Sequence, residues 1–301
     1  MNRKRLRQIL IGLLSTIVVI ALILGGYLFW RDHRPQPPSV RETLFNGITY
    51  IRDVRQQPRP LIIHVVQIDL TTPGLGFLVT PGDPVDGHEV RAQTVSEFLS
   101  KYNLQLAING DFFWPWWYHT ILDYYPHDHD PTDVNGFAAS RGAIYSEEQP
   151  DDPRPTLYLS LDNRAGIDQP IGAVYNAISG LPLIVEDGHI STQIKPDEYY
   201  AGVHPRSAVG LDRERKTLLL FVVDGRQPNY SEGVTLPELA QIAIEYGADS
   251  AINLDGGGSS TLVVEDQAGK PRVLNSPIHA NVPGMERPVG NQLGVWVTDD
   301  R

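Results

Sequence analysis

Residues 9–30, close to the N-terminus, form an uncharged run of 22 residues, and this run constrains the fold more than any other feature. A helix rises about 1.5 Å per residue, so the run is long enough to cross a hydrocarbon core about 30 Å thick. Basic residues flank it on both sides, and Tyr27 and Trp30 at its far end suit the membrane interface. The sequence therefore predicts a transmembrane anchor over residues 9–30.

A cleaved signal peptide and a buried core helix are the two alternatives to an anchor. The run is longer than the apolar part of a typical signal peptide, and no clear small-x-small cleavage site follows it. A core helix would be amphipathic or shorter. The anchor is therefore the favoured interpretation.

The basic cluster at the N-terminus orients the anchor. Cytoplasmic flanks carry an excess of Lys and Arg, so residues 1–8 are expected to form a cytoplasmic basic tail, and everything after Trp30 is expected to lie outside the cytoplasm. Residues 31–41 are rich in proline and predict a short, stiff stalk. No internal linker rich in Gly or Ser follows, so residues 42–301 are expected to form one domain.

Composition excludes several classes of function. The chain has no cysteine, which excludes a disulfide scaffold, an iron–sulfur centre, a cysteine nucleophile and a thiolate zinc site. Residues 35–301 carry a net charge of −16. Phosphate contacts in nucleic acids need clustered Lys and Arg, so no nucleic-acid partner is expected.

Apolar runs of strand length, rich in β-branched residues, recur through the outer domain. They are Leu61–Ile68, Leu75–Val79, Leu104–Ile108, Thr156–Leu161, Leu183–Val185, Leu218–Val223, Ala251–Leu254, Thr261–Val264 and Leu293–Val297. Two helices are predicted from capping boxes, in which Thr94 and Thr235 each stand three residues before a Glu. The second helix is expected to end at Gly247.

The second helix lies between two strands that each end in Asp-Gly, at Asp224 and Asp255. A strand, a helix and a strand within about 40 residues predict a βαβ unit with parallel strands and a right-handed crossover. Both carboxylates then emerge at one sheet edge, whether the strands are neighbours or have one strand between them. The expected fold class is α/β (mixed α+β): a mixed β-sheet core with at least one βαβ unit, helices packed on the sheet and one N-terminal transmembrane helix.

A glycine-rich loop follows Asp255. Its glycines let the backbone approach a ligand closely, and successive N–H groups in such a turn form a nest for anionic oxygens. The loop residues expected to bind substrate are Gly256, Gly257, Gly258 and Ser259. The loop matches no nucleotide-binding pattern. A tight, acid-capped turn is the alternative interpretation.

Other polar side chains stand next to expected strands. Arg206 precedes the strand Val209–Leu211 and offers a planar fork for a phosphate or carboxylate, with a surface ion pair as the alternative. Asn109, Gly110 and Asp111 follow an apolar strand and are further candidates for substrate binding, with a structural turn as the alternative.

Residues 114–136 combine aromatic side chains with His and Asp. Flat aromatic faces beside polar groups suit a sugar ring, and Trp116 and Tyr124 are predicted to contact it. The run His127–Asp130 contains residue types that ligate divalent metals. Neighbours in sequence rarely all face one ion, so a solvated loop is favoured there and no cofactor is expected.

Several stretches together resemble the phosphodiester glycosidase family, whose mammalian member removes N-acetylglucosamine from a phosphodiester. The matching pieces are Asn109–Phe113, Ser179–Pro182, Arg206–Gly210, Asp224–Arg226, Gly233–Glu238 and Ala251–Ser260. They cover about residues 104–297, and their order and spacing make the match specific. The family often has Gly where this chain has Asp111, and residues 114–136 have no clear counterpart in the mammalian enzyme.

The leading hypothesis is an extracytoplasmic glycosidase that cleaves a sugar-1-phosphodiester or related glycosidic bond in an envelope or extracellular glycan. Asp224 and Asp255 are the expected catalytic carboxylates, since glycoside cleavage generally uses an acid and a base or nucleophile. Arg206 and the glycine-rich loop would hold the anion. A non-catalytic glycan-binding module and a metal-dependent phosphodiesterase built on His127–Asp130 are the alternatives.

Overall fold

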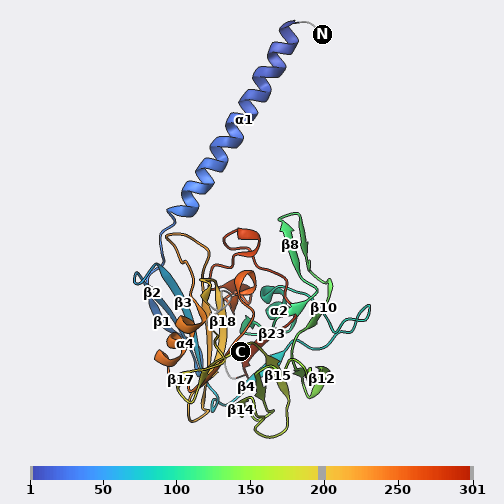
Figure 1. Ribbon diagram of the computed structural model, residues 1–301, viewed down its shortest axis with the longest axis vertical. Helices are drawn as coiled ribbons and strands as arrows, with labels where there is room; N and C mark the ends of the chain where they lie inside the picture. Colours follow the sequence, from blue (N-terminus) through green and yellow to red (C-terminus); the bar gives the residue numbers. More distant parts are fainter. Residues whose placement is uncertain (1–2, 196–200, 299–301) are drawn as a thin grey trace.

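The computed structural model describes residues 3–195 and 201–298, and consists of one long helix and a body of β-sheets (Figure 1). The helix α1 spans Arg3–Asp32 and stands clear of the body. Its apolar side chains are exposed, Leu22 by 70%, and residues 10–32 are long and apolar enough to cross a membrane. A signal sequence has the same properties, so the anchor stays a prediction.

The largest sheet has eight strands, and every neighbouring pair in it is antiparallel. Its strands in spatial order are β1 (Val40–Phe45), β2 (Ile48–Arg55), β3 (Leu61–Asp69), β19 (Thr217–Val223), β18 (Arg206–Leu211), β20 (Ser250–Asn253), β16 (Leu183–Glu186) and β17 (His189–Ile190). The central strands β18 and β19 are buried almost throughout. Their continuous apolar composition follows from burial on both faces.

Helix α4 (Leu236–Glu245) covers one face of this sheet and connects β19 to β20. Because β18 is antiparallel to both of these strands, β19 and β20 are parallel, with one strand between them. The predicted βαβ unit is therefore confirmed. The predicted capping box is also present, since Thr235 and Glu238 exchange hydrogen bonds, and Gly247 has a φ of +96° just after the helix.

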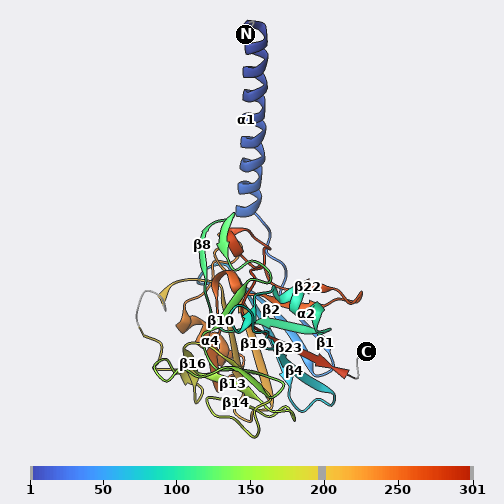
Figure 2. The ribbon, with the colours of Figure 1, turned by 90° about the vertical axis from the view of Figure 1, so that its right-hand side faces the viewer.

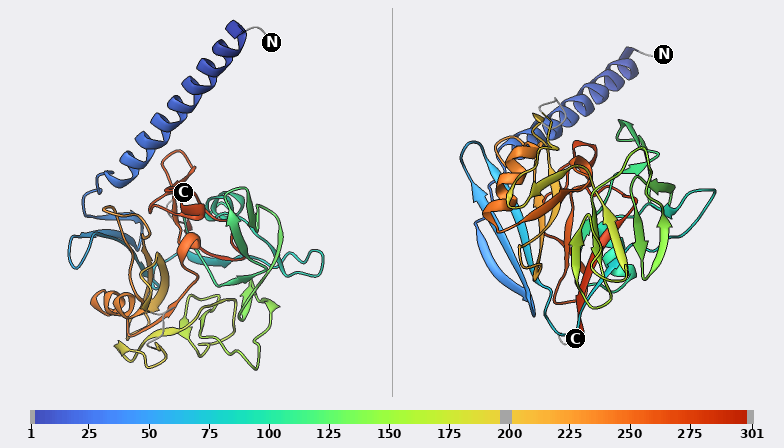
Figure 3. Two further views of the ribbon diagram at one scale, coloured as in Figure 1. Left: turned by 45° about the horizontal axis from the view of Figure 1, so that its top comes forward. Right: turned by 60° about the horizontal axis from the view of Figure 1, so that its bottom comes forward.

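Two five-stranded sheets lie against the other face of the large sheet (Figure 3). One has the order β22 (Pro271–Val273), β21 (Leu262–Glu265), β6 (Leu106–Asn109), β23 (Gln292–Val297) and β4 (Leu75–Val79). The other has the order β12 (Ala143–Ser146), β11 (Ala138–Ser140), β15 (Asn176–Ser179), β13 (Thr156–Leu159) and β14 (Ala165–Ile167). One cluster of buried apolar side chains includes residues from all three sheets. The body therefore folds around a shared core.

Smaller elements complete the body. They are the helix α2 (Val95–Lys101), the short helical turns η1 (Gly257–Ser259) and η2 (His279–Asn281), a three-stranded sheet of β5 (Val90–Arg91), β10 (Pro131–Val134) and β7 (Phe113–Trp114), and a hairpin of β8 (Trp117–Thr120) and β9 (Asp123–Tyr125). The β8–β9 hairpin lies at the end of the body nearest α1 in two perpendicular views (Figures 1 and 2).

Candidate active site

Hydrogen bonds join the loops that follow β6 and β20, two strands of different sheets. The Asp255 N–H donates to the Gly110 carbonyl at 3.0 Å, and the Asn109 side chain donates to the Asp255 carbonyl at 2.7 Å. The Asn109 side-chain oxygen also accepts hydrogen bonds from Ser207 and Thr261. Asn109 is fully buried, and its side chain joins the end of β6 to β18 and to the connection between β20 and β21.

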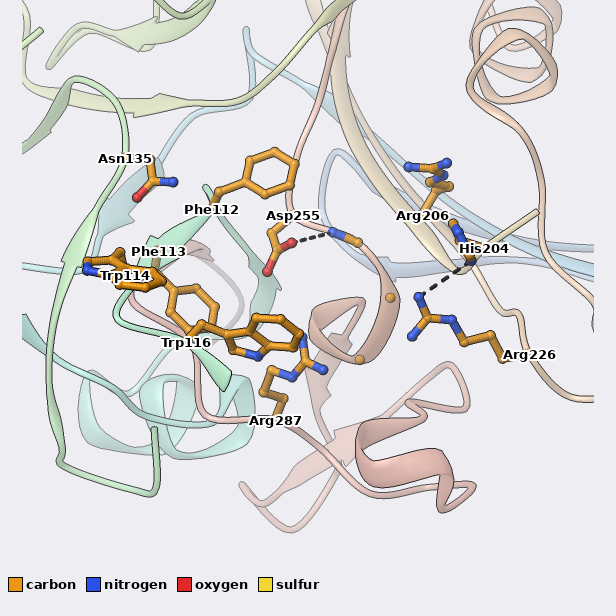
Figure 4. Close-up of a pocket in the computed structure, with 13 residues that line it drawn as sticks. Phe112, Phe113, Trp114, Trp116, Asn135, His204, Arg206, Arg226, Asp255 and Arg287 are labelled. Carbon is orange, nitrogen blue, oxygen red and sulfur yellow. Dashed lines mark hydrogen bonds between the residues drawn. The ribbon is translucent and has the colours of Figure 1, made fainter. Parts of the chain in front are cut away.

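These loops surround a pocket of about 340 Å³ (Figure 4). The residues that line it are Phe112, Phe113, Trp114, Trp116, Asn135, His204, Arg206, Arg226, Asp255, Gly256, Gly257, Gly258 and Arg287. Asp255 lies between an aromatic side and a side that carries His204 and Arg226 (Figure 4). The pocket therefore combines flat apolar faces with groups of both charges.

Asp255 is the carboxylate that faces this pocket. The N–H of Gly256 donates to its Oδ1 at 2.9 Å. Burial raises the pKa of Asp255, while the positive charges of Arg287 and Arg226 and the hydrogen bonds from Ser259 and Gly256 oppose this shift. The carboxylate is thus half-buried in the pocket wall and held among hydrogen-bond donors and positive charges.

Arg226 and Arg287 supply two guanidinium groups to the same pocket. Arg287 donates to Ser259 Oγ and to His279 Nδ1, both at 3.2 Å, and lies 5.1 Å from the ring centre of Trp116. Burial lowers the pKa of both arginines and the Asp255 carboxylate opposes this. Two guanidinium groups beside one carboxylate leave a positive surplus that suits an anion.

The glycine-rich loop lies in contact with both arginines. A Cβ on Gly258 would lie 2.5 Å from Arg287 Nη2, and one on Gly257 would lie 3.2 Å from Arg226. Gly257 also has a φ of +64°, which favours glycine. The glycines thus allow the arginines to approach the backbone closely.

Arg206 lies in the pocket wall but is only 2% exposed. Its guanidinium donates to the Gly202 carbonyl at 3.0 Å and to the Val234 carbonyl at 3.4 Å. These contacts tie together the segments before β18 and α4. Arg206, which was expected to hold the anion, therefore also stabilises the fold.

Asp224 is buried and is not among the residues that line the pocket. Its Oδ1 accepts the Ser276 N–H at 2.8 Å and the Asn275 side chain at 3.1 Å, and its Oδ2 lies 3.3 Å from His64 Nε2. His64 Nδ1 in turn lies 2.8 Å from the Tyr50 hydroxyl. Asp224 is 1% exposed, so it ends a buried Tyr–His–Asp chain.

Asp111 is a second buried carboxylate near the pocket. Its Oδ1 accepts the Phe112 N–H at 2.7 Å and lies 3.9 Å from Arg154 Nη1. Burial raises the pKa of Asp111 to about 7, with the Asp255 charge adding to the rise and Arg154 opposing it. Gly110 beside it is packed against Asn291, where a Cβ would lie 2.3 Å from Oδ1.

The aromatic segment enters the pocket through Trp114 and Trp116. Tyr124 instead packs edge-on against His279, with ring centres 4.7 Å apart. His127 pairs with Asp130 at 3.2 Å, while His129 lies 3.4 Å from Glu97 on α2. Within residues 3–195 and 201–298, no group of three or more His, Asp or Glu side chains is arranged to hold a metal ion.

Sequence reasoning missed Arg226, Arg287, His204 and His279 as residues of this region. Arg226 could have been predicted, because it belongs to the Asp-Gly-Arg sequence that follows a predicted strand. Arg287 comes from an irregular segment with no pattern that marks it. His279 accepts a hydrogen bond from Arg287, and burial together with Arg287 lowers the pKa of His279 to about 4.

Comparisons with known proteins agree with the motifs. A family model described as phosphodiester glycosidase matches residues 102–296. The human N-acetylglucosamine-1-phosphodiester alpha-N-acetylglucosaminidase is 26% identical over 251 residues, which are 78% of this chain and 46% of the human protein. The mouse enzyme of that name is 33% identical over 36% of this chain and 22% of its own length. The chain thus spans less than half the length of these relatives.

Solved structures share the fold. The catalytic domain of the zebrafish N-acetylglucosamine-1-phosphodiester alpha-N-acetylglucosaminidase, auto-inhibited by its pro-peptide, aligns with a TM-score of 0.58 at 20% identity, over 88% of this chain and 85% of that one. A hypothetical protein from Synechocystis aligns with a TM-score of 0.58 at 16% identity, over 87% of this chain and 64% of that one.

Proposed function

Because the family model covers most of the body, this chain belongs to the phosphodiester glycosidase family, and we propose that it hydrolyses the bond between a sugar and a phosphodiester in an envelope or extracellular glycan. The observation that carries this proposal is the meeting of Arg226, Arg287 and Asp255 in one aromatic-walled pocket. The human and mouse relatives are named for the same reaction class.

In this proposal the phosphate binds between the two arginines. Guanidinium forks match phosphate oxygens bidentately, and the glycine-rich loop beside them carries no side chain that would block the approach of the phosphate. The N–H groups of Gly256 and Gly257 already donate to Asp255 and to the Pro205 carbonyl, so the predicted backbone nest is not free at these two positions. The sugar ring stacks against the aromatic side formed by Phe112 and Trp116. The anomeric carbon is thereby held beside the Asp255 carboxylate.

Asp255 acts as the base in the proposed step. A water adds to the anomeric carbon and gives its proton to Asp255, while the bond from that carbon to the phosphate oxygen breaks. The phosphate group leaves with the electron pair, and Arg226 and Arg287 stabilise its added charge. Burial raises the pKa of Asp255, which strengthens it as a base.

Asp224 has a supporting role in the proposal. It fixes the segment that contains Asn275 and Ser276, and Asn275 also donates to the Ser260 carbonyl at 3.0 Å. This chain of contacts holds the end of the glycine-rich loop. The predicted pair of catalytic carboxylates is therefore revised to Asp255 in contact with substrate, with Asp224 positioning the loop.

We place this reaction on the outer side of the cell membrane. The exposed apolar surface of α1 and the basic residues at its start support a single-pass anchor with a cytoplasmic N-terminus. The body then faces envelope glycans, which are the expected substrates.

A screen of the full chain against sugar-1-phosphodiesters tests the function. Asp255→Asn should lower turnover at least about 100-fold with the fold intact, since acid–base catalysis alone contributes that much. Asp249→Asn, which alters a carboxylate paired with exposed Arg213, is the matched control. Glycan binding without turnover in the unmodified protein would contradict hydrolysis and favour a binding module.

A further inference from the structure

The tip of the β8–β9 hairpin exposes large apolar side chains to solvent. Ile121 and Leu122 form the turn and are 49% and 89% exposed. Trp117 at the start of β8 is 38% exposed and stacks on Tyr125 with ring centres 4.5 Å apart. The one carboxylate of the hairpin, Asp123, is paired with His119 at 3.1 Å. An exposed apolar tip above an aromatic belt is typical of a segment that enters a lipid interface.

The hairpin lies at the same end of the body as α1. Figures 1 and 2, which are perpendicular views, both show it reaching up to the level at which α1 ends. The other exposed leucine of the body, Leu161, lies in the turn between β13 and β14 at the opposite end. The apolar tip is therefore on the side that a membrane around α1 would occupy.

The stalk fixes this orientation through contacts with the body. Arg34 donates to the Gln227 side chain and, at 3.2 Å, to Ser276 Oγ, and its guanidinium lies 3.4 Å from the ring centre of Tyr230. Asn229 donates to the Asp32 carbonyl at 3.2 Å. The loop between β19 and α4, which also carries Arg226, is thus attached directly to the end of α1.

The stalk is so short that it keeps the body close to the bilayer at any tilt of α1. Trp30, the expected interfacial residue, is four residues before Arg34. An extended chain spans at most about 3.6 Å per residue, so Arg34 lies within about 14 Å of Trp30. The loop that Arg34 binds therefore lies near the headgroups, and the hairpin extends from the same end.

We propose that the tip of the β8–β9 hairpin, Ile121 and Leu122, inserts into the outer leaflet as a second membrane contact. This inference rests on the membrane anchor proposed above. The bilayer is the occupant because α1 brings it to this end of the body and the stalk contacts hold it there. The same segment supplies Trp116 to the pocket, where it lies over Arg287, so membrane contact and substrate binding share one element.

Labelling of single cysteines tests this contact directly, since the chain has no cysteine of its own. The full chain is reconstituted in phosphatidylcholine vesicles that contain doxyl-labelled lipid, with an environment-sensitive fluorophore at one position. Leu122→Cys probes the tip, Leu161→Cys is the exposed control at the far end, and Leu24→Cys in α1 is the membrane reference. The fluorophore at Leu122→Cys should be quenched several-fold more than that at Leu161→Cys.

A second measurement separates insertion from proximity. A label at Thr120→Cys should be quenched in the unmodified hairpin and lose most of this quenching when Ile121→Asp and Leu122→Asp are added. Equal quenching at Leu122→Cys and Leu161→Cys, or unchanged quenching after the two Asp substitutions, would overturn the proposal while leaving the anchor intact. Absence of quenching at Leu24→Cys would overturn the anchor and the proposal together. None of these readouts depends on enzymatic activity.

Discussion

The contacts of Arg287 best explain why the pocket suits an anion. Its guanidinium contacts a serine of the glycine-rich loop, a histidine with a lowered pKa and a tryptophan face. Three fixed neighbours orient the planar fork before any ligand arrives. A pre-organised fork loses little conformational entropy on binding, which suits it to the phosphate oxygens of the proposed substrate.

Arg287→Lys should lower kcat/KM about 10- to 100-fold on a sugar phosphodiester, because a lysine keeps the charge but cannot make paired hydrogen bonds. The measurement is steady-state kinetics with a thermal melt to verify folding. Arg213→Lys, on the surface with its side chain 76% exposed, is the control. Equal kinetics in the two variants would remove Arg287 from phosphate binding.

Asp224→Asn should lower the free energy of unfolding by about 1–3 kcal/mol, because a buried acceptor with three partners is altered. The loss of turnover should be smaller than in Asp255→Asn and should disappear when stabilising additives restore the fold. Urea unfolding and kinetics on the same samples check this. A rate loss of about 100-fold in a fully stable Asp224→Asn protein would instead return Asp224 to the catalytic pair.

Asp111 should make stability depend on pH. Folding raises its pKa from 3.8 to about 7, so the folded state binds more protons between these values and stability falls as the pH rises through this window. At about 1.4 kcal/mol per pKa unit, the loss is about 4 kcal/mol at most. Asp111→Asn should remove it, so this variant gains stability relative to the unmodified chain as the pH rises from about 4 to about 7. A pH-independent difference in urea unfolding would contradict the shift.

At the scale of elements, the capping residues of α4 and its packing on the large sheet favour the same helix. Its capping box satisfies the first N–H groups, and Leu236, Leu239 and Ala243 pack against the large sheet. Thr235→Ala should therefore lower the free energy of unfolding by about 1 kcal/mol. Urea unfolding checks this, with Thr192→Ala at an exposed position outside the helices and strands as the control. No difference between the two would mean that packing alone fixes the start of α4.

The elements that were predictable from sequence are those whose composition follows from their burial. Strands β3, β4 and β19 appear within one residue of the predicted apolar runs. The hairpin of β1 and β2 was missed, since β1 is mostly exposed. Strands of two to four residues such as β7 and β8 carry too little pattern, and their pairing is decided by distant contacts.

The place of the site on the sheet could be predicted from the sequence. Which side chains face the pocket was harder to predict. The crossover rule brought Asp224 and Asp255 to one edge of the sheet, as the parallel β19 and β20 require. It could not say that one carboxylate faces the pocket and the other a buried histidine. That choice depends on His64, which comes from a strand 160 residues away in sequence.

At the scale of the whole molecule, the core lies entirely within the β-sheet body. Its buried apolar residues begin at Ile48, and removal of residues 1–34 deletes the contacts of Arg34 with Gln227 and Ser276 but none of this apolar core. The 35–301 fragment should therefore fold alone, and its net charge of −16 should keep it soluble. Circular dichroism and size-exclusion chromatography check this. Aggregation in ordinary buffer would mean that α1 contributes to folding.

The seven residues between α1 and β1 also limit the distance between the membrane and the body. Even fully extended they reach about 25 Å, and the docked Arg34 shortens this further. Under the proposed function, a pocket held at such a height would cut a membrane-tethered glycan at that distance from the bilayer and not at its outer end. The length of the piece that stays attached would then be set by the distance between membrane and pocket, and a longer stalk would lengthen it.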